Sequence, residues 1–336
     1  MKSRWTNRRN HLATHGYAFV LLFFVLGGIV TARAASPSEA SQAPSTRTRN
    51  LAAKGGLFFD GFEGAISQQW RFGINGDTDP LRQAGDAQAI ARAGLVQIVD
   101  KPLRAGAHAV RFEVPRRLGS FRSELALSSV PMFSDYWYGF SIFIPKDWTN
   151  DPQDGDIVAQ WHGAANQDKK QFKVEGDSKG RPPVSLSLHD DRWEITFNWS
   201  SAVVKTAQDW ENFKTEREKK EIGKFQKGVW TDWVFHAHWS YKEDGLVEVW
   251  QNGKQVVNRK GPNCYNDPNG PYFKVGIYHP AWKDIKADTF NQQKLIIPRK
   301  VIYHDEVRVI PNGKYEDVAP RPPQGNADVP DQQKEQ

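Results

Sequence analysis

The sequence has 336 residues, with 45 Lys and Arg against 39 Asp and Glu, a formal net charge of +6 and one cysteine. The first 34 residues hold five of the basic residues and no acidic one, so the rest of the chain is almost neutral. This near balance argues against nucleic acid as a partner, and a single cysteine excludes an internal disulfide. The chain is long enough to bury a large core.

The N-terminus has the order of a secretory signal peptide: basic residues in 1–16, an apolar run at 17–30 and Ala-Arg-Ala at 32–34. The apolar run is shorter than the roughly 20 residues that a membrane-spanning helix needs. We expect cleavage after Ala34, export to the periplasm or the extracellular space and no membrane attachment afterwards; an uncleaved anchor is the alternative. We also expect a flexible linker at 35–54 and a disordered Pro-rich tail at 313–336.

Between these segments, short runs of alternating apolar and polar residues are separated by Gly, Pro, Asn and Asp. In chain order, strands are predicted at 57–63, 94–100, 108–114, 121–127, 136–145, 156–162, 183–189, 192–199, 231–239, 246–257, 272–278 and 301–310. Asn252-Gly253 predicts a two-residue hairpin turn within 246–257. We expect an all-β protein, a β-jelly-roll sandwich of two antiparallel sheets with a concave groove, over 55–312. We expect it to be a monomer.

One charged segment, 206–228, interrupts this pattern and is compatible with a helix from about Gln208 to Glu221. It predicts either a solvated insertion or a basic loop at the rim of a groove.

Three predicted strands place polar residues at even spacing, so that the members of each set share one face. These are Arg122 and Glu124 in Arg-Ser-Glu-Leu, Gln160 and His162 in Gln-Trp-His, and Lys274 and Tyr278 in Tyr-Phe-Lys-Val-Gly-Ile-Tyr. Guanidinium, amide and ammonium groups can neutralise a carboxylate, while imidazole and phenol groups can transfer protons. A neutralised carboxylate makes the hydrogen on its α-carbon more acidic, as β-elimination on a uronic acid requires.

The third of these strands has a second pattern. Gly276 lies between Lys274 and Tyr278, and we expect its missing side chain to let a sugar approach the backbone. Phe273, Val275 and Ile277 alternate with these residues and predict the core side of the strand.

The three short sequences resemble the motifs of the jelly-roll alginate lyases, Arg-Ser/Thr-Glu-Leu, Gln-Ile/Val-His and Tyr-Phe-Lys-x-Gly-x-Tyr. The stretch 228–278 resembles more closely the heparin lyase I-like polysaccharide lyases, a group allied to the glucuronan lyases, and the resemblance covers roughly 57–310. Trp161 stands where alginate lyases carry Ile or Val, and His-Pro follows Tyr278 where Asn-Gln is usual. Both departures favour a glucuronan- or heparin-like polymer over alginate.

The resemblance implies a polysaccharide lyase that acts by β-elimination on an anionic polysaccharide, without a metal or an organic cofactor. It implies that Tyr278 donates a proton to the leaving oxygen and that either His162 or Tyr278 removes the C5 proton. It also implies that Gln160 and Arg122 neutralise the carboxylate.

The remaining two motif residues have supporting roles by the same resemblance. Lys274 would lower the pKa of Tyr278 or hold the substrate, and Glu124 would orient Arg122 at the substrate.

Several other residues are candidates for ligand contacts. We expect His189, at the end of a predicted strand, and His238 to contact the substrate. His236 and His238 share a face as a metal pair would, but no third ligand is evident and we expect no metal site. Asp190 and Asp191 could hold a structural calcium ion, although turn capping is commoner.

Two other functions are compatible with the same fold. A glycoside hydrolase needs two carboxylates that flank one bond, and neither Glu-x-Asp-x-x-Glu nor Glu-x-Asp-x-Glu occurs in the sequence. A non-catalytic carbohydrate-binding module or lectin could use the 13 tryptophans to stack on sugars. Such a module has no need for His162 and Tyr278 to converge.

Overall fold

The computed structural model describes residues 58–321, except 77, 152–154, 164–180, 205, 284, 287, 288 and 290–296. The expected signal peptide and linker therefore lie outside the described residues, as does 322–336 of the expected tail. The first part of that tail forms helix α7 (Tyr315–Val318), where a disordered segment was expected. Val318 is buried against Val234 and Ile310.

Within the described residues, no helix combines the length and the apolar character needed to cross a membrane.

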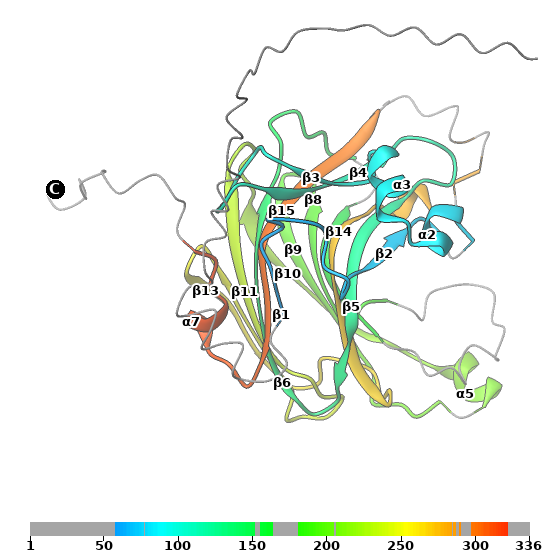
Figure 1. Ribbon diagram of the computed structural model, residues 1–336. Helices are drawn as coiled ribbons and strands as arrows, with labels where there is room; N and C mark the ends of the chain where they lie inside the picture. The colour runs from blue at the N-terminus through cyan, green and yellow to red at the C-terminus, as the bar shows by residue number, and fades with distance from the viewer. Residues whose placement is uncertain are drawn as a thin grey trace, which may run out of the picture. The chain divides into compact units, whose positions relative to one another are not determined.

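The described strands form two antiparallel sheets that pack face to face (Figure 1). The eight-stranded sheet has the order β13-β12-β11-β6-β15-β4-β3, and β1 pairs with β15. Its strands are β1 (Phe58–Asp60), β3 (Val96–Val99), β4 (Ala109–Pro115), β6 (Asp135–Phe143), β11 (Trp230–His238), β12 (Leu246–Gln251), β13 (Lys254–Lys260) and β15 (Arg299–Pro311). The predicted hairpin is confirmed, because Asn252 and Gly253 join β12 to β13 with positive φ angles of 49° and 84°.

The seven-stranded sheet has the order β10-β9-β8-β7-β14-β5-β2. Its strands are β2 (Arg71–Ile74), β5 (Arg122–Pro131), β7 (Asp156–His162), β8 (Val184–His189), β9 (Arg192–Trp199), β10 (Glu216–Lys224) and β14 (Asn269–Tyr278). All three sequence motifs lie in this sheet, on the neighbouring strands β7, β14 and β5. The expected sandwich of two antiparallel sheets is confirmed.

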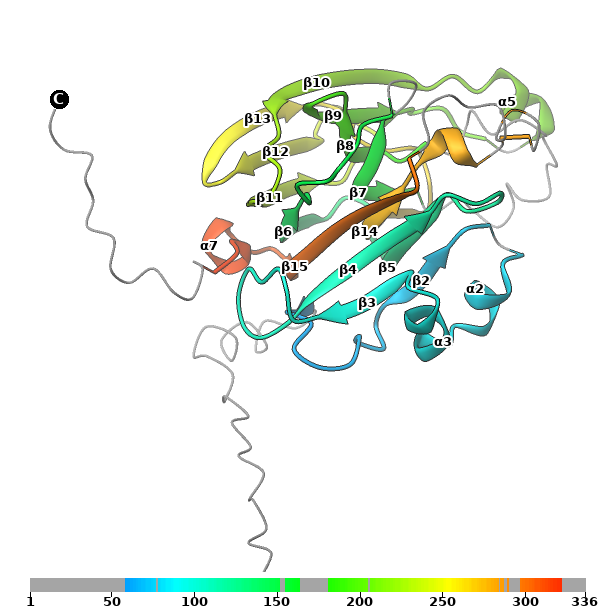
Figure 2. The same cartoon turned by 90° about the horizontal axis from the view of Figure 1, so that it is seen from above.

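Short helices complete the fold. Helices α2 (Pro80–Ala84) and α3 (Ala87–Arg92) lie beside β2 and β3, as Figure 2 shows. They begin after Asp79 and Asp86, whose carboxylates accept hydrogen bonds from the first free backbone N–H groups. The 3₁₀ helix η1 (Pro280–Trp282) follows β14.

The segment 206–228 differs from the expected long helix. Helix α5 covers only Ala207–Asn212, and Glu216–Lys224 forms β10, the edge strand of the seven-stranded sheet. The charged composition of β10 is explained by this position, because charged side chains on an edge strand oppose pairing with other chains.

The core lies between the two sheets and fixes which face of the seven-stranded sheet is free. Phe273, Val275 and Ile277 are fully buried, as predicted. Trp161 is also buried, and its ring lies 4.4 Å from that of Phe235 in the opposite sheet. Residues that alternate with these along β7 and β14 therefore point away from the core, toward the outer face of the seven-stranded sheet.

Candidate active site

The register of the seven-stranded sheet brings the three motifs together. Gln160 of β7 pairs with Lys274 of β14, and Tyr278 of β14 pairs with Arg122 of β5. His162 lies two residues beyond Gln160 on β7, on the same face. Five predicted site residues from three segments of the chain thus occupy one surface.

A groove of about 1480 Å³ opens over this surface. Its lining includes five arginines and two lysines: Arg71, Arg82, Arg122, Arg181, Arg217, Lys274 and Lys283. Gln160, His162, Tyr272 and Tyr278 also line it. Among the described residues of the lining there is no Asp or Glu. A groove lined by one sign of charge concentrates ligands of the opposite sign, so this surface favours a polyanion.

Glu124 lies beneath the groove and not in it. Its side chain is 2% exposed, Oε1 accepts a hydrogen bond from Gln160 Nε2, and Oε2 accepts one from Lys274 Nζ at 3.2 Å. The Nε of Arg122 is 3.8 Å from Oε2, an ion pair without a hydrogen bond. Because both oxygens are occupied, Glu124 is placed to position its neighbours and not to contact the substrate.

Lys274 and Arg122 carry the positive charge at the centre of the groove. Burial lowers the pKa of Lys274, the carboxylate of Glu124 opposes this effect, and the charge of Arg122 adds to the lowering. Arg122 donates a hydrogen bond through Nη2 to the backbone carbonyl of Asn75, a residue with a positive φ of 43°. This contact holds the guanidinium at the floor of the groove.

His162 is half-buried and suited to accept a proton. Its Nδ1 lies 3.0 Å from the backbone carbonyl oxygen of Gly163, which has no proton to donate, so Nδ1 carries the proton of the neutral ring. The Nε2 lone pair is then the proton acceptor. Burial lowers the pKa of His162 to about 4, and the positive charge of Lys274 acts in the same direction. The imidazole is therefore neutral near pH 7.

Tyr278 is half-buried and also lines the groove. Its ring packs edge-on against Phe121, with 5.9 Å between the ring centroids. On β7 its backbone pairs with Ile157, five residues before His162, and the side chains of Tyr278 and His162 both line the groove.

A buried network fixes the backbone just after Tyr278. The backbone N–H of His279 donates to the carbonyl of Phe121 at 2.8 Å, and its ring Nδ1 lies 2.9 Å from a carboxylate oxygen of Asp156. The ammonium of Lys300 is 2.9 Å from the other oxygen of Asp156. His279 is thus a structural residue that anchors the C-terminal end of β14.

Tyr272 was not among the predicted site residues, although it begins the third motif. It pairs with His162, and the two ring centroids are 5.2 Å apart. Lys274 Nζ lies 5.4 Å and the guanidinium of Arg71 lies 5.8 Å from the centre of its ring. The period-two pattern of the strand could have identified Tyr272, because it shares a face with Lys274.

Two predicted substrate contacts are wrong in position. His189 is the last residue of β8 and is exposed, and its Nδ1 lies 3.3 Å from Oδ2 of Asp190. His238 belongs to β11 in the opposite sheet, where its Nδ1 lies 2.9 Å from Asp135. Neither residue lines the groove. The alternation of β11 identified a polar face correctly, but that face belongs to the eight-stranded sheet.

The expected role of Gly276 is also corrected. Its φ is +129°, and a Cβ atom there would lie 2.3 Å from the carbonyl oxygen of Ser123 and 2.6 Å from the Cα of Glu124. The close approach that requires glycine is therefore to the backbone of β5, and not to a sugar.

Asp191, considered above for a calcium site, forms an ion pair of 2.9 Å with Lys224. The single cysteine, Cys264, is buried, which raises the pKa of its thiol. Across the part of the chain that the structure describes, no three His, Cys, Asp or Glu side chains form a group that could hold a metal ion.

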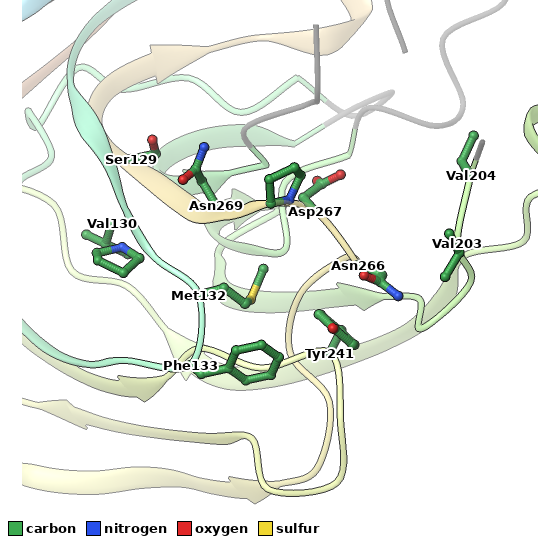
Figure 3. Close-up of a pocket in the computed structure, with 12 residues that line it drawn as sticks. Ser129, Val130, Met132, Phe133, Val203, Val204, Tyr241, Asn266, Asp267 and Asn269 are labelled. Carbon is green, nitrogen blue, oxygen red and sulfur yellow. The ribbon is translucent and has the colours of Figure 1, made fainter. Parts of the chain in front are cut away.

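A smaller pocket of about 700 Å³ adjoins the groove and shares Ser129 with it (Figure 3). Phe133 and Tyr241 lie along one side, and Asn266, Asp267 and Asn269 lie along another. None of the motif residues lines this pocket, so the larger basic groove is the candidate active site.

Comparisons with known proteins identify the family and the fold. The sequence matches the family described as Polysaccharide lyase over residues 63–308, within the expected lyase domain. A search of curated proteins found no match. The fold is similar to that of an endo-β-1,4-glucuronan lyase from the fungus Trichoderma reesei, with a TM-score of 0.56 and 18% identity over 68% of this chain and 90% of that one.

Matches to two alginate lyases were also found. One is AlyA1 from Zobellia galactanivorans, with a TM-score of 0.41 and 16% identity over 75% of this chain and 98% of that one. The other is vAL-1 from Chlorella virus, with a TM-score of 0.42 and 12% identity over 78% of this chain and 96% of that one. The family match covers well over half of the chain, including all three motifs and most of the groove. The protein thus belongs to the polysaccharide lyase family and is an enzyme that acts on a polysaccharide.

Proposed function

We propose that the protein cleaves a uronic-acid-containing polysaccharide by β-elimination, and that a glucuronan- or heparin-like polymer is preferred over alginate. The observation that carries this proposal is the basic groove, in which Arg122 and Lys274 lie among the proton-transfer candidates His162 and Tyr278. The preference for the polymer rests on the departures from the alginate lyase motifs at Trp161 and after Tyr278.

In this mechanism, the uronate carboxylate lies against Arg122 and Lys274, which neutralise it and stabilise the negative charge that develops as C5 loses its proton. Gln160 donates one amide hydrogen to Glu124, and its second amide hydrogen can contact the carboxylate.

Proton transfer completes the reaction. His162 Nε2 accepts the C5 proton, the C4–O bond breaks as the C4–C5 double bond forms, and the hydroxyl of Tyr278 protonates the leaving oxygen. The neutral state of His162 supports its role as the base, although Tyr278 could take both steps if its phenol were first ionised.

The groove also weighs against the alternative of a glycoside hydrolase. That reaction requires two carboxyl groups on either side of the scissile bond. The described lining of the groove has none, and Glu124 beneath it has both oxygens occupied.

The proposal includes export of the protein. The basic, apolar and small-residue order of 1–34 supports a cleaved signal peptide and a mature chain of 35–336 in the periplasm or outside the cell.

The test is ultraviolet absorbance of the purified 35–336 chain mixed separately with glucuronan, alginate, heparin, heparan sulfate and pectate. A rise in absorbance from the unsaturated product on glucuronan, heparin or heparan sulfate supports the proposal. A rise on alginate alone contradicts the substrate preference. Cleavage that yields saturated products contradicts β-elimination.

A further inference from the structure

Three residues of the groove lie apart from the motif strands, near the outer edge of the seven-stranded sheet: Arg181, Asn198 and Arg217. Arg217 lies on β10, which is three strands from β7 in the sheet order. At the usual spacing between strands, this places it about 14 Å from the strand that carries Gln160 and His162. A ligand group here would belong to a different sugar from the one in the centre.

The sheet and one loop bring these residues together. Arg217 pairs with Asn198 across β10 and β9. The Nδ2 of Asn198 donates a hydrogen bond of 2.8 Å to the carbonyl of Pro182, and its backbone N–H donates one of 2.7 Å to Pro183. Arg181 directly precedes these two prolines, so its guanidinium is held on the same side of the groove.

The two guanidinium groups have no anionic partner of their own. Neither the Arg181 side chain nor the Arg217 side chain forms an ion pair or a hydrogen bond within the residues that the structure describes. Glu194 is near Arg217, but its carboxylate already forms an ion pair with Lys219, with 2.9 Å between Oε1 and Nζ. Two guanidinium groups on one wall of the groove, unneutralised by the protein, attract an anion.

A second observation comes from Asn198. It is only 1% exposed, and its Oδ1 has no hydrogen-bond partner among the described residues. Its orientation is fixed, because Nδ2 must face the carbonyl of Pro182. A buried amide oxygen without a donor is costly, and a hydroxyl group could supply the missing donor.

We propose that Arg181, Arg217 and Asn198 form an outer subsite for a second acidic sugar, with the two guanidinium groups on its carboxylate or sulfate and Asn198 Oδ1 accepting from a hydroxyl. This inference rests on the proposed function. If the subsite binds a second acidic sugar, the substrate is a polymer with anionic groups on more than one sugar. A polymer with a single uronic acid among neutral sugars would leave the subsite empty.

The experiment compares Arg217→Gln with Lys220→Gln. Lys220 is exposed on the same strand and its side chain points to the opposite face, so its substitution removes the same charge without touching the groove. Both variants are tested by gel retardation in glucuronan and in heparin, and by the rate of product absorbance on oligosaccharides of increasing length. Thermal unfolding by circular dichroism confirms that both retain the fold.

We expect Arg217→Gln to weaken retardation and to raise KM for the polymer about tenfold or more, because it removes a charge-assisted contact. The shortest oligosaccharides that are cleaved should be unaffected, and Lys220→Gln should match the wild type throughout. Equal behaviour of the two variants on polymer overturns the inference, as does a wild-type protein that neither polymer retards. Retardation that depends on Arg217 without any product would support the subsite while contradicting the proposed chemistry.

Discussion

Lys274 and Glu124 form an ion pair that is almost completely shielded from water, with 3.2 Å between Nζ and Oε2 and exposures of 4% and 2%. Burying two charges costs several kcal/mol per ion, and the attraction between them offsets this cost only while both are present. The pair therefore makes the floor of the groove sensitive to the loss of either partner.

Glu124→Gln should destabilise the protein by about 3–5 kcal/mol, because it leaves the Lys274 ammonium buried without a counter-charge. The free energy of unfolding, measured in urea, checks this. Glu124→Gln combined with Lys274→Met should recover part of the loss, since no unpaired charge remains. A double variant no more stable than Glu124→Gln alone would show that the pair does not act as a unit.

The acid limb of the pH profile should reflect the environment of His162. Burial lowers its pKa to about 4, with a further contribution from Lys274, so the base stays unprotonated well below the ordinary histidine value of about 6.5. We expect kcat/KM for the preferred polymer to fall only as the pH approaches 4. Since kcat/KM reports the free enzyme, a limb near 6.5 would contradict this assignment.

The same shift has a consequence for stability. Between pH 6.5 and 4 the unfolded chain binds a proton at His162 that the folded protein does not, so the free energy of unfolding falls as the pH falls through this window. His162→Gln removes this group. The difference in unfolding free energy between pH 7 and pH 4.5 should therefore be smaller in His162→Gln than in the wild type.

The fold could be predicted wherever one face of a strand is buried. The run at 192–199 alternates between polar and apolar residues throughout, and the predicted strands at 192–199 and 156–162 match β9 and β7 residue for residue. The edge strand β10 was missed because neither of its faces is buried in the core, so its sequence has no apolar alternation. The four-residue strand β2 was missed because it is too short to establish a pattern.

The site could be predicted only in part, for a related reason. Even spacing indicates that Gln160 and His162 share a face, but it does not show which of the two sheets the strand joins. His238 has a pattern equally typical of a polar face and lies on the other sheet. The backbone carbonyl of Asn75 accepts a hydrogen bond from Arg122. This contact could not be predicted from the sequence, because every residue has a backbone carbonyl.

The two tyrosines of the third motif should differ in their effects. Tyr278→Phe removes the proposed proton donor and should reduce kcat by roughly 10²–10⁴-fold, the usual contribution of general acid catalysis. Tyr272→Phe removes a hydroxyl from the ring beside His162 and should leave a large part of kcat. Initial rates of product absorbance at saturating polymer check both. If Tyr272→Phe has the larger effect, the proton donor is the tyrosine next to His162.

The last prediction concerns Gly276, whose φ of +129° is matched by the φ of +128° at Gly223 in the edge strand β10. A Cβ atom at Gly223 would meet nothing within 4 Å, whereas one at Gly276 would meet the backbone of β5 at Ser123 and Glu124. Gly223→Ala therefore measures the cost of the backbone conformation alone.

Gly276→Ala adds the steric conflict to that same conformational cost, and β14 must separate from β5 to relieve it. We expect Gly276→Ala to lower Tm by several degrees more than Gly223→Ala, and to lower kcat because Tyr278 and Arg122 are a register pair on these two strands. If the glycine instead served only to let a sugar approach, Gly276→Ala would raise KM while its Tm matched that of Gly223→Ala. Thermal unfolding and steady-state kinetics on the two variants distinguish these outcomes.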